Sequence, residues 1–295
     1  MKSEGAEPNG ILPVDKPEGP TSHDVVARAR RALHTRRIGH TGTLDPFASG
    51  LLLLCVGSAT RLAEYLVGMD KSYQAVIRLG ERTDTDDRTG NVISATELWR
   101  ELPPEAVRAA AAEFQGDLLQ VPPAYSAKKV EGERMYERAR RGQAVELPPV
   151  PVTVSRLSVL AVDLPDVTVE IDCSSGTYIR AIARDLGERL GVGAHLAALR
   201  RTRIGTHDIA EAITVAELDD PEIVRRGWIA PADALGHLAH LEVSPAQARE
   251  IGHGGPVAAP ESMTGDATVA ITLDGDLIAV GEVTGGMLRP RKVFP

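Results

Sequence analysis

The stretch from Arg37 to Gly50 contains the clearest candidate for chemistry in the chain. Its three glycines and Pro46 predict a tight loop, because glycine tolerates positive φ and proline fixes φ. The apolar run at residues 51–56 predicts a buried strand directly after it. Asp45 is then held on a rigid loop at the edge of the core, where a carboxylate can act as a nucleophile or base. An aspartate before proline also often caps its own turn, so the loop alone leaves both interpretations open.

The segment HTGTLDP at residues 40–46, followed by Ala48 and Gly50, resembles the catalytic signature of the TruB family, the bacterial tRNA pseudouridine synthases. The match is long and ungapped. The resemblance implies that Asp45 is the nucleophile. It also implies a mixed, mainly antiparallel sheet flanked by helices, with a cleft across its middle.

Two further segments resemble motifs of the same family. Residues 71–73, Lys-Ser-Tyr, resemble the second motif, in which the tyrosine is catalytic. The strand pattern alone favours a core tyrosine with its hydroxyl satisfied, and only the resemblance favours the catalytic interpretation. Residues 173–180, CSSGTYIR, resemble the third motif, whose arginine pairs with the catalytic aspartate. Arg180 near a helix start opposes the helix dipole, so its charge needs another partner. We expect an ion pair with Asp45, the alternative being a surface arginine.

The resemblance also assigns residues to substrate binding. His40 is expected to stack within the T loop in place of a flipped base, although a hydrogen bond that stabilises its own loop is the simpler interpretation. Tyr178 and Leu199 are expected to line the uracil pocket. Lys16 belongs to an N-terminal motif, and Lys129 to a "thumb" insertion at about residues 119–151. In that insertion Lys128 replaces the aliphatic residue usual in the family.

The composition sets limits on partners and cofactors. The chain has 295 residues, 43% of them hydrophobic, and a net charge of −8, which argues against a generic nucleic-acid binder. Basic residues nevertheless cluster, and phosphate binding depends on local charge.

The two cysteines are far apart in sequence, so we expect no zinc site and a reduced, cytoplasmic protein. No Walker, Rossmann or metal motif is present, and we expect no cofactor and no metal. No signal pattern or membrane-length apolar run occurs. The four basic clusters are residues 28–37, residues 128–141, Arg200 with Arg201 and Arg203, and Arg289 with Arg291 and Lys292.

The family resemblance implies an α+β fold. A catalytic domain is expected at residues 1–235, and a small β-barrel that resembles a PUA domain at 236–295, where Asp274-Gly275 predicts a hairpin turn. The acidic segment 80–90 is interpreted as a solvated loop. Strands are predicted at 11–14, 72–79 and 167–174, and helices after Thr21 and at 58–66, 104–114, 128–141 and 177–190.

The family resemblance implies isomerisation of uridine-55 in the T loop of tRNA, by base flipping and an aspartate-dependent break and re-formation of the glycosidic bond. Asp45 must stay ionised in a dry pocket, which a nearby Arg180 favours; whether it attacks C1′, attacks C6 or removes the 2′ proton stays open. Tyr73 is expected to help remove the C5 proton. The alternatives are a non-catalytic tRNA-binding or tRNA-folding chaperone, and a metal-dependent hydrolase using His40 and Asp45. The expected partner is the tRNA T arm, with no membrane, no protein partner and a monomeric state.

Overall fold

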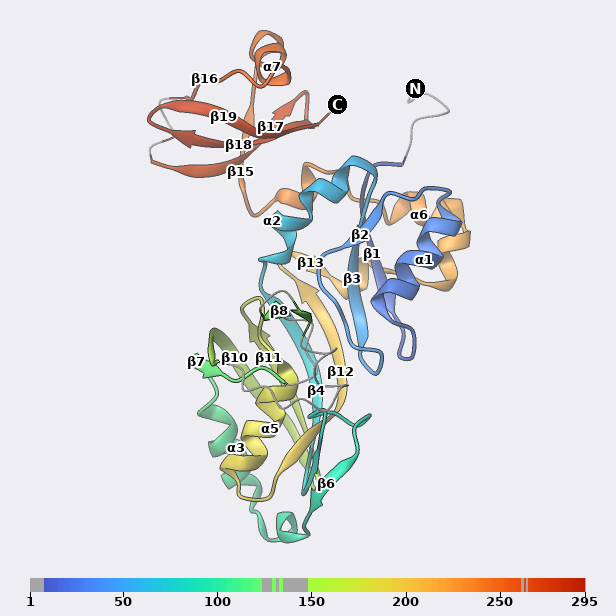
Figure 1. Cartoon of the computed structure of the whole chain (residues 1–295), viewed down its shortest axis with the longest axis vertical. Coiled ribbons are helices and arrows are strands. Elements are labelled where there is room, and N and C mark those ends of the chain that lie inside the picture. Colours follow the sequence, from blue (N-terminus) through green and yellow to red (C-terminus); the bar gives the residue numbers. More distant parts are fainter. Residues whose placement is uncertain are drawn as a thin grey trace. The chain divides into compact units, whose positions relative to one another are not determined.

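The computed structural model describes residues 8–123, 129–130, 133–134, 148–260, 263 and 265–294 (Figure 1). The chain packs into two compact units. The first comprises residues 1–44, 51–67 and 205–295, and the second comprises residues 45–50 and 68–204. This division follows packing and does not test the predicted boundary at residue 235, which stays a prediction.

The second unit is built on an antiparallel sheet with the strand order β12-β4-β11-β10-β7. The first residues of β3 pair in parallel with β12, so the sheet is mixed and mainly antiparallel, as predicted. Helix α5 contacts β12 and β4, and α3 contacts β10 and α5, so both helices lie on one face of the sheet (Figure 1). Strand β3, Ser49–Val56, has its first two residues in this unit and the rest in the first unit. The other elements are β4 Lys71–Leu79, β5 Glu81–Thr83, β6 Val92–Ala95, η2 Leu98–Glu101, α3 Pro104–Ala112, β7 Gly116–Gln120, β8 Lys129–Val130, β9 Glu133–Arg134, β10 Val150–Asp163, β11 Asp166–Cys173, α5 Ile179–Arg189 and β12 Ala194–Ile204.

Strand β4 shows the alternation that its sequence predicts. Tyr73, Ala75 and Ile77 are buried on one face, whereas Gln74 and Arg78 are exposed on the other, because successive side chains of a strand point to opposite faces. Strand β12 departs from simple alternation. Its register against β4 shifts between Leu196 and Ala198 and again between Arg201 and Arg203, so an extra residue, a β-bulge, interrupts the ladder at 197 and at 202.

The first unit contains β1 beside β3 and β14, and helix α1. Thr21 caps α1 in a capping box with Asp24, as the sequence predicts. The helix predicted at 58–66 is instead a 3₁₀ turn that continues into a short α-helix. The elements are β1 Gly10–Lys16, α1 Ser22–Ala32, β2 Ile38–His40, η1 Gly57–Leu62, α2 Ala63–Val67, β13 His207–Asp208, η3 Ile209–Glu211, β14 Ile213–Thr214, η4 Ala216–Asp219, α6 Pro221–Arg226 and η5 Asp233–Leu235.

The C-terminal part of the first unit is a curled five-stranded sheet with the order β15-β17-β18-β19-β16, which fits the predicted PUA-like domain. The predicted hairpin joins β17 to β18, and Asp274 and Gly275 both have positive φ, 52° and 81°, as a two-residue hairpin turn of this type requires. The elements are β15 Ala239–Glu242, α7 Pro245–Gly252, β16 Val257–Ala258, β17 Ala267–Leu273, β18 Asp276–Thr284 and β19 Met287–Val293.

Part of the thumb prediction needs correction. Lys129–Val130 and Glu133–Arg134 pair as antiparallel strands β8 and β9, so a continuous helix over 128–141 is wrong at these residues. Most of the remaining segment lies outside the described residues. Across the part of the chain that the structure describes, no helix is long and apolar enough to cross a membrane.

Candidate active site

The loop that carries Asp45 is fixed on both sides of that residue. Before it, the Ser22 hydroxyl of α1 accepts from Leu44 N at 2.9 Å and lies 3.2 Å from Leu44 O. After it, Ala48 N donates to Asp45 O at 3.1 Å, closing a turn. At Gly50, φ is +110° and a Cβ would collide with the backbone of Arg201, so only glycine allows the loop to enter β3 against β12. The loop therefore presents Asp45 from a rigid base, as the glycines and proline predict.

Arg180 lies in the first turn of α5 and contacts Asp45. Its Nε is 3.2 Å from Asp45 Oδ2, so the expected ion pair is present. The guanidinium is almost fully buried, with 8% of the side chain exposed, whereas the Asp45 side chain is 37% exposed. A buried cation thus holds a carboxylate that solvent reaches.

Asp87 is a second carboxylate on Arg180 that the sequence interpretation missed. Its Oδ2 lies 3.2 Å from Arg180 Nη1, and its side chain is only 4% exposed. The same Nη1 donates to Thr85 O at 3.1 Å. Thr85 Oγ1, Thr89 N and Thr89 Oγ1 donate to Asp87 Oδ1 at 2.9, 2.9 and 2.6 Å. The carboxylate is therefore saturated with donors, as a buried charge must be.

The interpretation of residues 80–90 as a solvated loop is therefore wrong at Asp87. Arg88 N donates to Leu196 O, and Leu196 N donates to Asp86 O, both at 3.0 Å, so the loop runs along β12 as an extra bridge. A weak signal was available in the sequence: threonines at 83, 85 and 89 alternate around the acidic residues, and such side chains satisfy a buried carboxylate.

Tyr73 and Leu199 lie on the same face of the sheet. Leu199 pairs with Ala75, and Tyr73 pairs with Arg201. All four residues are at most 8% exposed. Burial raises the pKa of the Tyr73 phenol, and the negative charge of Asp45 raises it further, while the positive charge of Arg201 and a hydrogen bond from it act in the opposite direction. The structure thus brings Tyr73 into electrostatic contact with Asp45.

The third predicted basic cluster does not act as one group. Arg200 and Arg203 pair with Gln74 and Ser72, residues on the face opposite to Tyr73, and Arg203 Nε donates to Ser72 Oγ at 3.0 Å. Arg201 is only 2% exposed and cannot contact an RNA phosphate. The interpretation of all three as surface phosphate contacts is therefore wrong for Arg201.

Lys71 adds another buried cation to the same strand. It is 7% exposed, and Nζ donates to Met69 O. Burial, and then the charge of Arg201, lower the pKa of Lys71 to about 8. The face of β4 around Tyr73 is therefore electropositive, which favours anionic groups there.

The remaining predicted site residues have diverse surroundings. Tyr178 caps α5, and its backbone N and O both bond the buried Gln120 amide, at 2.8 and 3.0 Å. His40 Nδ1 accepts from Gly42 N at 3.3 Å, and its ring meets His23 edge-on, so the loop-stabilising bond is present. Lys16 is fully buried and donates to Pro17 O, which excludes it from direct RNA contact in this conformation. The Lys129 side chain lies outside the described part.

The partly exposed Asp45 differs from the expected dry pocket. Solvent reaches 37% of its side chain in the free protein, while the groups behind it, Arg180 and Asp87, are dry. A substrate that covers Asp45 would complete the desolvation. Arg180, which holds Asp45 in place, is thus already buried before any substrate binds.

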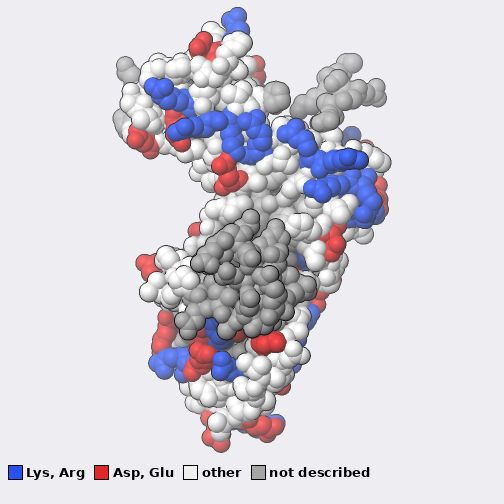
Figure 2. All heavy atoms as spheres, in the orientation of Figure 1, with Lys and Arg blue, Asp and Glu red and all other residues white. Residues whose placement is uncertain are grey.

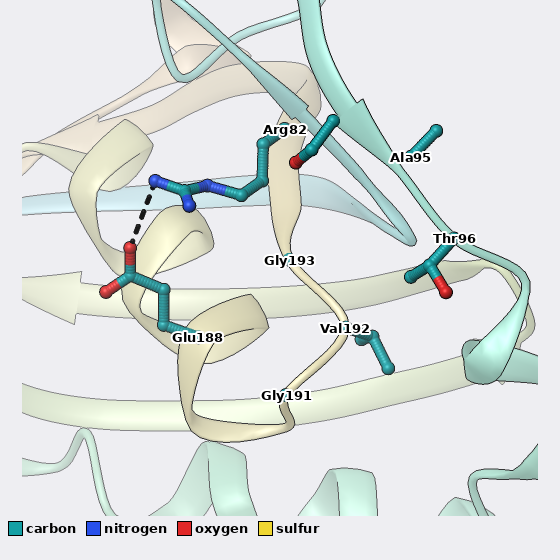
Figure 3. Close-up of a pocket in the computed structure, with 8 residues that line it drawn as sticks. Arg82, Ala95, Thr96, Glu188, Gly191, Val192 and Gly193 are labelled. Carbon is teal, nitrogen blue, oxygen red and sulfur yellow. Dashed lines mark ion pairs between the residues drawn. The ribbon is translucent and has the colours of Figure 1, made fainter.

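A separate pocket is lined by other residues (Figure 3). Arg82 and Glu188 form an ion pair of 3.4 Å at its side, and the backbone of residues 191–193 closes it. None of the predicted site residues lines it. Among the described residues, no three His, Cys, Asp or Glu side chains gather in a way that could hold a metal ion.

Comparison with known proteins identifies the family. Residues 30–179 match the model of the TruB family pseudouridylate synthase N-terminal domain, and residues 180–235 match that of the tRNA pseudouridylate synthase B C-terminal domain. The "tRNA pseudouridine synthase B" of Arthrobacter sp. (strain FB24) is 45% identical, over 97% of this chain and 96% of that protein. That of Mycobacterium avium (strain 104) is 47% identical, over 85% and 82%.

A solved structure shows the same fold. The crystal structure of the archaeal box H/ACA Nop10-Cbf5 complex contains a chain that superposes with a TM-score of 0.75 at 27% identity, covering 97% of this chain and 86% of that one. The family models together span the Asp45 loop, Tyr73, Arg180 and Leu199. On these grounds, this chain belongs to the TruB family of pseudouridylate synthases.

Proposed function

We propose that this protein converts uridine-55 in the T loop of tRNA to pseudouridine. The observation that carries the proposal is the Asp45–Arg180 pair, whose arginine is buried and held from behind by Asp87 while the carboxylate of Asp45 is open to solvent. The nearby guanidinium favours the charged form of this carboxylate, and its open side can meet a base that has left its stack. The names of the relatives supply tRNA as the substrate class.

The reaction needs no redox change, and the residues at hand cover its steps. Asp45 is the group that attacks or accepts a proton as the C1′–N1 bond breaks. Arg180 holds its negative charge in place, and Asp87 holds Arg180. Leu199 and Tyr73 form an apolar surface on one face of the sheet against which uracil can rotate before C5 rejoins C1′. Tyr73 then removes the C5 proton.

RNA capture is assigned to residues outside this core. Figure 2 shows Lys and Arg side chains gathered, on the visible face, over the C-terminal sheet and over the region of α1. Arg28 of α1 already contacts Asp219, and Arg291 contacts Glu282 at 2.7 Å, so part of this charge is neutralised within the protein. The T arm and the phosphates next to it are the expected ligands of these surfaces, through contacts that weaken with salt.

The test is tritium release from 5-tritiated uridine in a T-arm stem-loop. One RNA carries the label at position 55 only, and a matched RNA carries it at position 54 only. Wild-type protein is expected to release tritium from the first RNA and not the second, and Asp45→Asn from neither, although it binds both.

Two results would contradict the proposal. Release from position 54 would assign a different target uridine. No release from either RNA despite tight binding would leave an RNA-binding or RNA-folding protein. A chelator should not change the rate, and a chelator-sensitive activity would instead indicate metal-dependent chemistry at His40 and Asp45.

A further inference from the structure

Arg201 is a buried cation for which the proposed steps have no use. It is 2% exposed and ranks among the largest fully buried side chains of the described part. Burying a guanidinium is costly unless it is bonded, and burial lowers the pKa of Arg201. A chain keeps such a charge only where the fold or the reaction uses it.

The backbone places Arg201 between the two strands that carry the reaction. Arg201 pairs with Gly50 at the start of β3, five residues after Asp45, and on its other side with Tyr73 in β4. Directly opposed side chains on antiparallel strands share a face, with Cβ atoms about 4.5–5.5 Å apart. The guanidinium therefore lies on the face that Tyr73 presents, and the two side chains are hydrogen-bonded.

The direction of that hydrogen bond follows from the groups. A guanidinium has only N–H donors and no acceptor, so the phenol oxygen of Tyr73 must accept. The phenol proton is then directed away from Arg201. If the proton leaves, the resulting phenolate faces a positive charge at hydrogen-bond distance, in a site where the effective dielectric constant is low.

We propose that Arg201 is a positioning residue for Tyr73: it fixes the phenol oxygen and stabilises the phenolate that removes the C5 proton. This inference rests on the function proposed above and deepens its last step. Tyr73 is otherwise a poor base, since an ordinary phenol has a pKa of about 10, and both burial and Asp45 raise the pKa of this one. Arg201 supplies the opposing effect.

The proton step balances without a co-reactant. Tyr73 first loses its proton to water. After C5 has rejoined C1′, the phenolate takes the C5 proton; the C5–H electron pair becomes the C5=C6 bond, and the electrons of the C6=N1 bond move to N1, which takes a proton from water. Tyr73 again carries its proton at the end.

The chain offers a matched control on the same strand. Arg203 lies two residues from Arg201 but on the other face, where its side chain is 45% exposed and pairs with Asp172 at 3.5 Å. The bulge at residue 202 separates the two orientations. Arg201→Met and Arg203→Met remove the same charge from opposite faces, and Arg201→Lys keeps the charge on a different donor geometry.

The experiment measures the titration of Tyr73 and the rate together. Tyrosine labelled with ¹³C at Cζ reports ionisation by NMR, and Tyr73→Phe identifies the signal among the five tyrosines. Single-turnover rates at saturating RNA are measured with 5-protio and 5-deutero uridine. Arg201→Met should raise the Tyr73 midpoint by about one pH unit or more, slow turnover about tenfold or more and enlarge the deuterium isotope effect. Arg201→Lys should fall between wild type and Arg201→Met. Arg203→Met should match wild type in the Tyr73 midpoint and in the isotope effect.

An unchanged Tyr73 midpoint and isotope effect in a folded Arg201→Met, with turnover lost or kept, would overturn the inference and leave Arg201 a structural residue. If Arg201→Met does not fold, Arg201→Lys carries the same test, and a wild-type midpoint there overturns it. An inactive wild-type protein would instead contradict the proposed function. The Tyr73 midpoints are measured without RNA, so they would still report on the contact between Arg201 and Tyr73.

Discussion

The candidate site and the C-terminal sheet use charge in opposite ways. Around the site, Arg180, Arg201, Lys71 and Asp87 are each at most 7% exposed, and every one has a partner. In the C-terminal sheet the Arg291–Glu282 pair is 63% and 41% exposed. Buried charges cost several kcal/mol when a partner is lost, whereas exposed pairs contribute about 0–1 kcal/mol. The electrostatic cost of burial is therefore larger at the candidate site than in the C-terminal sheet.

The largest expected effect is at the one open member of the site. Asp45→Asn keeps the shape and removes the charge, so turnover should fall by at least about a thousandfold, roughly 4 kcal/mol of activation free energy. RNA affinity should change less than about threefold. Single-turnover tritium release and filter binding measure the two quantities, and a parallel loss of affinity would indicate a role in binding.

Asp87→Ala tests whether the loss of a buried charge partner destabilises the fold more than the loss of an exposed one. It leaves Arg180 buried beside an empty space, so the free energy of unfolding should fall by about 3–5 kcal/mol, and turnover should fall with it. Asp166→Ala is the control, because its pair with Arg78 is 33% and 44% exposed and is expected to contribute under about 1 kcal/mol. Urea denaturation measures the free energy of unfolding of both variants. Equal losses would contradict the expected difference between the buried and the exposed pair.

Lys71 should give the stability curve a distinct pH dependence. Its pKa is about 8 in the folded protein against an ordinary value of 10.5 for lysine. The unfolded chain therefore binds more protons between these values, and stability from this group rises with pH. The full cost below pH 8 is about 3 kcal/mol. Lys71→Met should therefore be more stable at pH 7, and the difference from wild type should shrink as pH rises towards 10.5.

The comparison with the variant matters because two thiols act in the opposite direction. Burial raises the pKa of Cys55 to about 12 and that of Cys173 to about 11, so their contribution to stability falls as pH rises above 9. Both proteins carry these thiols, so the difference between their stabilities removes the contribution of Cys55. Cys173 and Lys71 shift the pKa of each other, so the comparison reports on Lys71 most directly below pH 9, where both thiols are protonated. A difference that does not vary with pH would show that Lys71 titrates normally.

The smallest effect is expected in the C-terminal sheet. Arg291→Gln breaks an exposed pair and should change the free energy of unfolding by under about 1 kcal/mol with no change in the single-turnover rate at saturating RNA. The affinity and its salt slope should fall slightly if this face binds phosphate. A lowered rate at saturation would mean that the sheet takes part in the chemistry.

The sequence was sufficient for features encoded locally. The Asp45 loop, the capping box at Thr21, the alternation of β4 and the Asp274 hairpin depend on neighbouring residues, and each was predictable. The pairing of Arg180 with Asp45 was expected from an arginine unfavourably placed for its helix dipole together with the resemblance of residues 173–180 to the third family motif. The part that failed depends on distant contacts.

Asp87 shows why, since its partner is 93 residues away and its acidic neighbours are typical of a solvated loop. The prediction that Lys16 binds substrate was wrong for a related reason. A lysine is usually exposed, and only the tertiary structure shows that this one is fully buried. The sequence did not distinguish Arg201 from its neighbours Arg200 and Arg203, because nothing in the local pattern marks one of the three as buried.

The two bulges of β12 determine which residues of this strand face the buried side of the sheet. Towards the N-terminus, even-numbered residues such as Leu196 face β4's buried side; between the bulges the odd-numbered Leu199 and Arg201 do; beyond them Ile204 restores the even series. The strand thus changes parity twice, and the reversed window coincides with the residues opposite Tyr73 and Ala75. Two inserted residues, rather than any change of side-chain type, decide which arginine of the strand enters the core.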